Sequence, residues 1–535
     1  MVTIGKNILG NLTTGMYKDS KIAYREYIQN ACDQIDKAIE ERLITKDEAE
    51  VNIWIDSKNR SISIEDNATG VEKDKFLTQL GDIANSDKKL GKNKGFRGIG
   101  RLCGLAYCRQ LIFSTSFKGE PVESVMIFNA KKMRALLEAE GKDTVENILY
   151  KITTVKENEA DIDSHYFKVE LIDINEDNKD LLDVEKVKDY LSFVAPVPYT
   201  NKFSFAKKIY KHAKEIGSKI DEYSVYINGD MLFKEYKTTI YSPAKNGGVD
   251  VWDKIRDVKF HDFYDDDKKL IAWMWYGISR FDGALNKLAN PMYGLRVRQG
   301  NIQIGDSESL THLFKEHRGN SYYIGEVFAV AKNLIPNSQR DYFNENRGRS
   351  IFENLLKPVL YTDFYKLYHD ANIAKGLYKH IESLNTANEK LQEKREKGFV
   401  DNKEKNMLEA NVIKASQIVE REGKKLIELE NTSAQDRESA IAIVRNAIKE
   451  HYERKGIVSN NQAKTEELVK AQEDTTSSNK KERKPQYFAD QFSHLSRDER
   501  KIVTQIMSVV NKIAPEEIAN KIQKEVAKKL RKKGN

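Results

Sequence analysis

The stretch Ile22-Ala-Tyr-Arg-Glu-Tyr-Ile-Gln-Asn-Ala-Cys-Asp-Gln-Ile-Asp36 decides how the first part of this chain folds. Glu26, Asn30 and Asp33 stand at i, i+4 and i+7, so at about 3.6 residues per turn their side chains share one stripe of a helix. The apolar residues fall mainly on the other faces, and these are Tyr24, Tyr27, Ile28, Ala31, Ile35 and Ala38. The helix can therefore dock on a core while it presents its polar stripe, either to solvent as an ordinary helix face or to a metal ion and a water.

The composition is that of a protein with several globular domains. The chain has 535 residues, of which 39% are hydrophobic and 32% charged, which is enough for roughly three or four domains. No apolar run approaches the roughly 20 residues that span a bilayer, and the first residues lack the basic and then apolar pattern of a secretory signal. We therefore expect a cytoplasmic protein with no membrane partner. Cys32, Cys103 and Cys108 are too few and too irregularly spaced for a zinc site or a disulfide framework, so we interpret them as small buried residues.

The net charge of +7 is concentrated at one end of the sequence. Residues 521–535 hold seven Lys or Arg against the single acid Glu525, which gives +6, and the other 520 residues sum to +1. An attraction to nucleic-acid phosphate would therefore be strongest in this tail.

Strand and helix patterns predict two α/β domains in the first part of the chain. Residues 1–203 mix helices with strand-like runs, and residues 204–370 contain further strands around an Asn228-Gly229 hairpin turn. The runs that predict strands are 51–55, 61–65, 111–114 and 167–172 in the first domain, and 224–227, 230–233 and 270–278 in the second.

The rest of the sequence predicts helices and a linker. Residues 371–456 contain no proline and carry apolar residues at helical spacing, which indicates an antiparallel hairpin, a dimeric coiled coil or a bundle packed on its own domain. Residues 457–488 are polar with almost no aromatics and predict a flexible linker, and residues 489–535 predict a basic helical tail.

Two further segments carry residues suited to a nucleotide. Asp66 follows directly on a predicted strand and can accept a hydrogen bond from an exocyclic amine such as that of adenine, while Gly70 lets a ligand approach the backbone. The stretch Gly95-Phe-Arg-Gly-Ile-Gly100 clusters backbone N–H groups that suit phosphate, and the lysines before it suit a closing lid. Its spacing differs from the dinucleotide fingerprint, and the P-loop pattern does not occur.

In this order, the motifs resemble the ATPase module shared by gyrase, heat-shock protein 90 chaperones, histidine kinases and MutL, which is called GHKL. Residues 16–36 and Leu80-Gly-Asp-Ile-Ala-Asn-Ser86 are most similar to the heat-shock protein 90 chaperones. The resemblance implies an α/β sandwich of the Bergerat type in residues 1–203, with ATP and Mg²⁺ as cofactors.

The resemblance also implies roles for individual residues. Glu26 would be the general base for the attacking water, Asn30 the magnesium ligand, Asp33 its support and Asp66 the adenine contact. Gly70 would border the adenine, and the remaining nucleotide contacts would come from Asn85, Lys94, Gly95, Phe96, Arg97, Gly98, Ile99 and Gly100. The sequence departs from the family at Ala68, where glycine is usual, and no threonine is assigned to the adenine site.

A second match lies in Asn333-Leu-Ile-Pro-Asn-Ser-Gln-Arg-Asp-Tyr-Phe343, which resembles the catalytic loop of the chaperone middle domain. The match implies that Arg340 reaches the γ-phosphate and that Asn337 holds the loop. A fixed guanidinium beside the developing phosphate charge is what phosphoryl transfer needs. The alternative is an arginine satisfied by a neighbour such as Asp341, with Arg296, Arg298 and Lys332 as the other candidate cations.

The resemblance covers roughly residues 1–370, and the layout beyond it is closer to MORC-like ATPases and to bacterial GHKL proteins of phage defence and repair. It implies a magnesium-dependent ATP hydrolase that acts as an ATP-gated clamp, homodimeric at least when ATP is bound, with a role in defence against phage and a protein client or effector. One alternative is a MORC- or MutL-like clamp that binds DNA through the basic tail. The other is a nucleotide-gated scaffold that recruits an effector nuclease.

Overall fold

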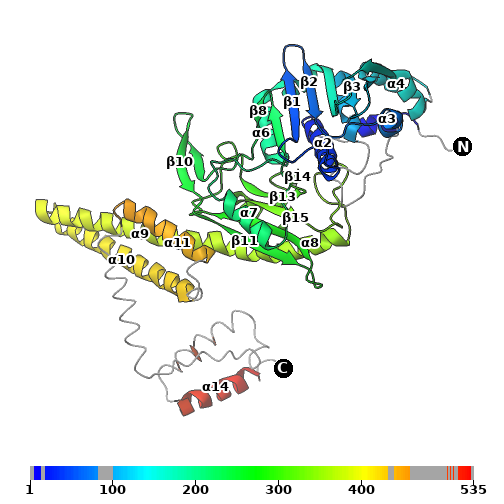
Figure 1. Cartoon of the computed structure of the whole chain (residues 1–535). Coiled ribbons are helices and arrows are strands. Elements are labelled where there is room, and N and C mark those ends of the chain that lie inside the picture. The colour runs from blue at the N-terminus through cyan, green and yellow to red at the C-terminus, as the bar shows by residue number, and fades with distance from the viewer. Residues whose placement is uncertain are drawn as a thin grey trace. The chain divides into compact units, whose positions relative to one another are not determined.

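A computed structural model describes residues 5–13, 19–81, 100–141, 143–431 and 439–457 and, near the C-terminus, residues 503, 506, 507, 510 and 516–531. The chain divides into two compact units, Met1–Val458 and Ser459–Asn535 (Figure 1). In the second unit, helix α14 (Glu516–Arg531) exposes Lys521, Lys528 and Lys529 as well as Ile518 and Ile522. None of the helices within the described ranges is both long and apolar enough to cross a membrane.

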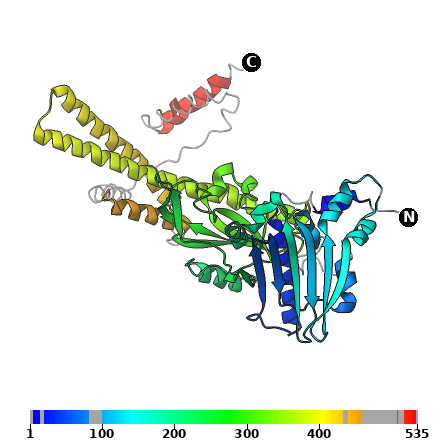
Figure 2. The same cartoon turned by 90° about the horizontal axis from the view of Figure 1, so that it is seen from above.

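The first sheet has eight strands in the order β5-β4-β3-β6-β2-β1-β7-β8. Figure 2 shows its blue and cyan strands side by side. Alternate residues of β2, Ile62, Ile64 and Asp66, are buried, as expected of a strand with one covered face. The strands are β1 (Glu50–Asp56), β2 (Ser61–Asp66), β3 (Cys108–Ser116), β4 (Val122–Asn129), β5 (Thr153–Glu159), β6 (Tyr166–Ile174), β7 (Ser224–Ile227) and β8 (Asp230–Met231).

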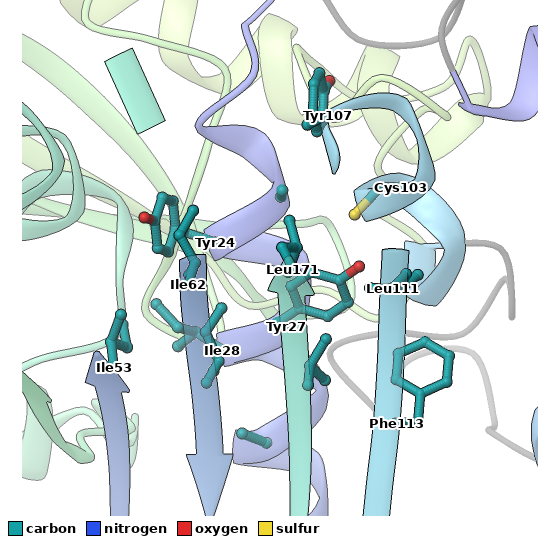
Figure 3. Close-up of a cluster of buried hydrophobic side chains, with 14 of the residues drawn as sticks. Tyr24, Tyr27, Ile28, Ile53, Ile62, Cys103, Tyr107, Leu111, Phe113 and Leu171 are labelled. Atoms are coloured by element: carbon teal, nitrogen blue, oxygen red, sulfur yellow. The ribbon is translucent and has the colours of Figure 1, made fainter. Parts of the chain in front are cut away.

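Helix α2 (Ile22–Glu40) contributes Tyr24, Tyr27 and Ile28 to the core of this sheet (Figure 3). The apolar face that the sequence pattern predicts is therefore the face that packs, and all three free cysteines are buried as expected. Burial raises the pKa of Cys108 to about 12. The other helices of this part are α1 (Asn7–Thr13), α3 (Lys73–Gly81), η1 (Gly100–Ala106), α4 (Ala130–Glu138), α5 (Val145–Ile152), η2 (Glu176–Leu182) and α6 (Val184–Val194).

The Asn228-Gly229 hairpin forms as predicted but belongs to the first sheet. Strand β7 pairs in parallel with β1, from Glu50 opposite Ser224 to Ile53 opposite Ile227. The Asn228 side chain locks the pairing, because its Oδ1 accepts from the Ile55 backbone N–H at 2.8 Å. The expectation that the strands within residues 224–233 lie in the second domain is therefore wrong, since β7 pairs with a strand near the start of the chain and β8 pairs with β7.

The second sheet has five strands in the order β11-β12-β15-β13-β14. On β12, Trp273 and Trp275 face the core that includes helix α7, whereas Ala272 and Met274 face the core that includes helix α8. This alternation makes a layer of helix on each side of the sheet. The elements are α7 (Ala206–Glu215), β9 (Thr239–Pro243), β10 (Val249–Lys254), β11 (Asp257–Tyr264), β12 (Leu270–Ile278), β13 (Gly294–Gln299), β14 (Ile302–Ile304), η3 (Thr311–Leu313), η4 (His317–Tyr322), β15 (Ile324–Ala329) and α8 (Arg347–Pro358).

A network of fully buried charges joins the strands of the second sheet to the segment that enters it. Glu326 accepts from Lys234 at 3.0 Å and from Arg298 Nε at 2.6 Å, and it also accepts from the Tyr199 hydroxyl. Burial raises the pKa of Glu326, but Arg298 and Lys234 outweigh this effect and hold it at about 2. Burial and repulsion from Arg298 lower the pKa of Lys234 to about 7.

Long helices follow the second sheet. Helix α8 continues through the π-helical turn η5 (Val359–Asp363) into α9 (Phe364–Lys397), whose Ala371, Leu377 and Ile381 still pack in the core of the second sheet. Gly398, at φ 93°, ends α9, and α10 (Asn402–Asn431) returns beside it, while α11 (Ala440–Arg454) packs on α9 (Figure 1). The predicted fold class, α/β with a C-terminal helical segment, is confirmed.

Candidate functional site

Helix α2 holds the polar stripe of Glu26, Asn30 and Asp33 in a largely buried position. Glu26 and Asp33 are each 5% exposed, and Asn30 is half-buried. A carboxylate that is this deeply buried needs partners to offset its desolvation. The stripe is therefore not an ordinary solvated helix face, which was the alternative left open by the sequence.

The carboxylate of Glu26 lies between two arginines. Arg340 Nε lies 3.0 Å from Glu26 Oε1, and Arg25 donates to the same oxygen at 3.2 Å. The other oxygen, Oε2, faces Gly100, where an added Cβ would lie only 2.4 Å away. The structure thus brings Glu26, Arg340 and Gly100, three residues singled out from distant parts of the sequence, to one point.

The loop that carries Arg340 is held by its own backbone. Arg340 has a φ of 54°, a left-handed conformation that costs a non-glycine residue roughly 1–2 kcal/mol. Its carbonyl accepts from the Gly305 N–H at 2.8 Å, and its N–H donates to Asn337 O at 3.2 Å. Asp341, the neighbour that could have satisfied Arg340, instead accepts from the Asn337 side chain.

The other candidate cations lie elsewhere. Arg298 is bound to Glu326 in the core of the second sheet, and Arg296 donates to Gln303 at 2.9 Å. Lys332 is exposed.

Asp66 ends strand β2 on the face that α2 covers. It is 4% exposed, and its Oδ1 accepts from the Ala68 N–H at 3.1 Å. Gly70, four residues after Asp66, has a φ of 65°, and a Cβ there would lie 1.9 Å from the carbonyl oxygen of Ser116. Only glycine therefore fits at position 70.

Sequence reasoning missed two residues that fix the loop after Asp66. The hydroxyl of Thr115 donates to Tyr166 O at 2.7 Å and accepts from the Val71 N–H at 3.0 Å. His165 places Nδ1 2.8 Å from the carbonyl oxygen of Ala68, so Nδ1 carries the proton and donates. No local signal could have identified them, because strand pairing brings them to this loop from β3 and from the start of β6.

The glycine-rich segment and the residues before it fall mostly in the range 82–99. The predicted residues Asn85, Lys94, Gly95, Phe96, Arg97, Gly98 and Ile99 lie outside the described residues. Gly100 is described, at the start of η1.

Comparison with known proteins identifies the superfamily. Residues 17–161 match the family model of histidine kinase-, DNA gyrase B- and HSP90-like ATPases. These residues include Glu26, Asn30, Asp66 and Gly100. The N-terminal part of this chain belongs to the GHKL superfamily and is HSP90-like.

Relatives of this GHKL region are bacterial chaperones named HtpG. The protein from Coxiella burnetii is 33% identical over 87 residues, which are 15% of this chain and 14% of that protein. The protein from Wigglesworthia glossinidia brevipalpis is 25% identical over 284 residues, 48% of this chain and 38% of that protein. The protein from Shewanella loihica is 27% identical over 163 residues, 27% of this chain and 24% of that protein. The chain therefore spans well under half the length of these relatives.

Proteins of the GHKL superfamily bind ATP, usually with Mg²⁺, and the residues on α2 fit such an ion. Mg²⁺ keeps several waters and takes one or two protein oxygens in addition to the phosphates of its substrate. The amide of Asn30, which is half-buried and lies one turn after Glu26 on the same stripe, supplies an oxygen of this kind. Within the described ranges, no group of three or more His, Cys, Asp or Glu forms a dedicated metal cage.

Proposed function

We propose that this protein is a magnesium-dependent ATP hydrolase that works as an ATP-gated conformational clamp. The observation that carries the proposal is the contact between Glu26 on α2 and Arg340 on the loop between the second sheet and α8, at 3.0 Å. A candidate base on a helix that packs on the first sheet and a candidate cation on a loop that follows the second sheet therefore lie next to each other. Hydrolysis of a γ-phosphate requires both a group that activates the water and a cation that stabilises the developing charge.

In the proposed reaction, Asp66 accepts a hydrogen bond from the adenine amino group, and the backbone at Gly70 borders the ring. Asn30 holds Mg²⁺, which would neutralise phosphate charge when bound. Glu26 takes a proton from a water whose oxygen attacks the γ-phosphorus, and the bond to the bridging oxygen of ADP breaks. Arg340 stabilises the charge that develops on the γ-phosphoryl oxygens.

Arg340 cannot serve both partners fully at once. The contact that the structure shows neutralises Glu26, whereas the proposed reaction needs the guanidinium on phosphate and the carboxylate available to water. Binding of ATP therefore has to draw Arg340 away from Glu26. This movement couples the loop that follows the second sheet to the nucleotide bound beside α2. A rearrangement of this kind is how a nucleotide gates a clamp.

The ATPase test compares the wild type with Glu26→Ala and Arg340→Ala. We expect hydrolysis to fall to background in Glu26→Ala, with ATP binding retained, and to fall by at least about 10³-fold in Arg340→Ala. Wild-type turnover in Arg340→Ala would refute the participation of the second sheet. Sedimentation with and without a slowly hydrolysed ATP analogue tests the dimer, since HSP90-like GHKL proteins generally dimerise.

Two competing hypotheses concern what the clamp binds. A protein client is suggested by the chaperone relatives, whereas the exposed Lys521, Lys528 and Lys529 of α14 favour a clamp that touches DNA phosphate. Duplex DNA should then raise the ATPase rate in a salt-sensitive way, and replacing these three lysines by glutamine should abolish the effect. No effect of DNA at low salt would favour the protein client.

A role in bacterial defence against phage is part of the proposal and rests on the layout of the sequence. Bacteria that express the wild type should show a reduced plating efficiency of phage. Glu26→Ala should lose this protection if hydrolysis drives the clamp. Protection retained by Glu26→Ala would instead support the nucleotide-gated scaffold that recruits an effector.

A further inference from the structure

The residue after Glu26 on helix α2 makes two hydrogen bonds through its side-chain hydroxyl to one short helix. Tyr27 is 3% exposed, and its hydroxyl accepts from the Gly104 N–H at 3.0 Å and donates to Arg101 O at 3.1 Å. Both partners belong to η1, the helix that begins at Gly100. Figure 3 shows the Tyr27 ring reaching from α2 toward the segment that carries Cys103.

Two glycines of η1 are shaped to two adjacent residues of α2. A Cβ on Gly104 would lie 2.5 Å from the Tyr27 hydroxyl oxygen, and a Cβ on Gly100 would lie 2.4 Å from Glu26 Oε2. Real Cβ atoms do not approach so closely, so with any larger residue at either position the Tyr27 or Glu26 side chain would have to move. The docking of η1 on α2 therefore fixes the distance between the Gly100 backbone and the Glu26 carboxylate.

We propose that Tyr27 is a positioning residue for Glu26: by fixing η1 on α2, it holds Gly100 against the carboxylate and sets the direction in which Oε2 points. The inference rests on the proposed role of Glu26 as general base. Oε1 is held by Arg25 and Arg340, so the backbone at Gly100 is the wall on the opposite side of the same carboxylate. A base that can rotate away from its water loses rate even when ATP still binds.

The chemistry of the hydroxyl suits this role. Burial raises the pKa of Tyr27 well above its usual range, so the hydroxyl keeps the proton that it donates to Arg101 O. It can therefore donate and accept at once, which a phenylalanine ring cannot do.

The same helix offers a matched control. Tyr24 is 1% exposed, and its hydroxyl donates at 2.6 Å to the carbonyl oxygen of Leu181, which belongs to η2 and not to η1. Tyr24→Phe and Tyr27→Phe each remove a buried hydroxyl from α2. Only the second change releases η1.

The experiment measures kcat, the Kd of ATP and hydrogen exchange in full-length Tyr27→Phe, Tyr24→Phe and Glu26→Ala proteins. We expect Tyr27→Phe to lower kcat by about 10- to 100-fold with the Kd changed by less than about threefold, and to speed amide exchange at Gly104. Tyr24→Phe should keep kcat within about threefold of the wild type and leave exchange at Gly104 unchanged. Gly104→Ala, whose methyl would displace the hydroxyl, should reproduce the kcat loss and add little to Tyr27→Phe.

The outcomes separate this inference from the proposed function. Equal kcat in Tyr27→Phe and Tyr24→Phe, with turnover lost in Glu26→Ala, would overturn the positioning role and leave the ATPase intact. Turnover that survives Glu26→Ala would overturn the proposed function itself. A Tyr27→Phe protein that loses ATP binding in proportion to kcat would show that the hydroxyl supports the fold of the site as a whole, which also contradicts the inference.

Discussion

The competition between Glu26 and ATP for Arg340 predicts that removing the charge of Glu26 strengthens ATP binding. Two unit charges about 4 Å apart attract by about 4 kcal/mol at an effective dielectric constant of about 20. Arg25 shares the carboxylate at 3.2 Å, and desolvation offsets part of the attraction. We take roughly 1.4–2 kcal/mol as the part that ATP must displace, so Glu26→Gln should tighten ATP binding by about 10- to 30-fold while hydrolysis is lost.

The assay is a double-mutant cycle on the Kd of ATP, measured by calorimetry in the wild type, Glu26→Gln, Arg340→Ala and the double variant. Glu26 also repels phosphate directly, and that effect persists when Arg340 is absent. The gain from Glu26→Gln should therefore shrink to about threefold or less in the Arg340→Ala background. An equal gain in both backgrounds would refute the reasoning, because the change would then reflect simple repulsion between carboxylate and phosphate and not the release of Arg340.

Three other predictions concern stability. Glu326→Gln should destabilise the second sheet by about 3–5 kcal/mol in denaturant, because it leaves Arg298 and Lys234 buried without a carboxylate. Lys234→Met should cost less, because Glu326 keeps Arg298 as a partner; equal costs would contradict this account. Because the pKa of Glu326 is about 2, its contribution to the free energy of unfolding is complete above its usual pKa near 4.5 and is lost as the pH falls toward 2. Because the pKa of Lys234 is about 7, the free energy of unfolding rises between pH 7 and 10.5. Melting curves should show both trends, and Lys234→Met should remove the second. Gly70→Ala should melt at least several degrees lower and lose ATP binding, since its Cβ would lie 1.9 Å from Ser116 O; a wild-type melting temperature would show that this loop adapts.

The elements of the first sheet could be predicted wherever one local pattern decides burial. Alternation in 61–65 and the helical stripe of 22–36 gave β2 and α2, because each depends on neighbours within a few residues. The place of β7 could not be predicted in the same way. The Asn228-Gly229 turn announces a hairpin, but the choice of β1 as its partner depends on a strand that lies far away in the sequence.

The same distinction applies to the candidate site. The sequence singled out Glu26, and the resemblance singled out Arg340, but neither predicts that the two side chains meet at 3.0 Å. Tyr27 was assigned to the apolar face of α2 from its spacing, and its ring does pack there. What the spacing could not predict is the use of its hydroxyl, which depends on a glycine 77 residues further along the chain.

Adjacent positions on one turn of α2 therefore receive contacts from two separate segments. Glu26 meets the loop of Arg340, and Tyr27 meets η1, which directly follows the glycine-rich stretch. A movement of either segment should therefore shift the Glu26 carboxylate, because α2 is packed into the core and cannot move separately from it. Coupling of this kind requires an element that both sites bias, and the Glu26 side chain, held on opposite sides by Arg340 and Gly100, is that element. The losses of turnover caused by Tyr27→Phe and Arg340→Ala should consequently be less than additive in the double variant. The losses caused by Tyr24→Phe and Arg340→Ala should add. Additive losses in both pairs would show that the two segments act on catalysis separately.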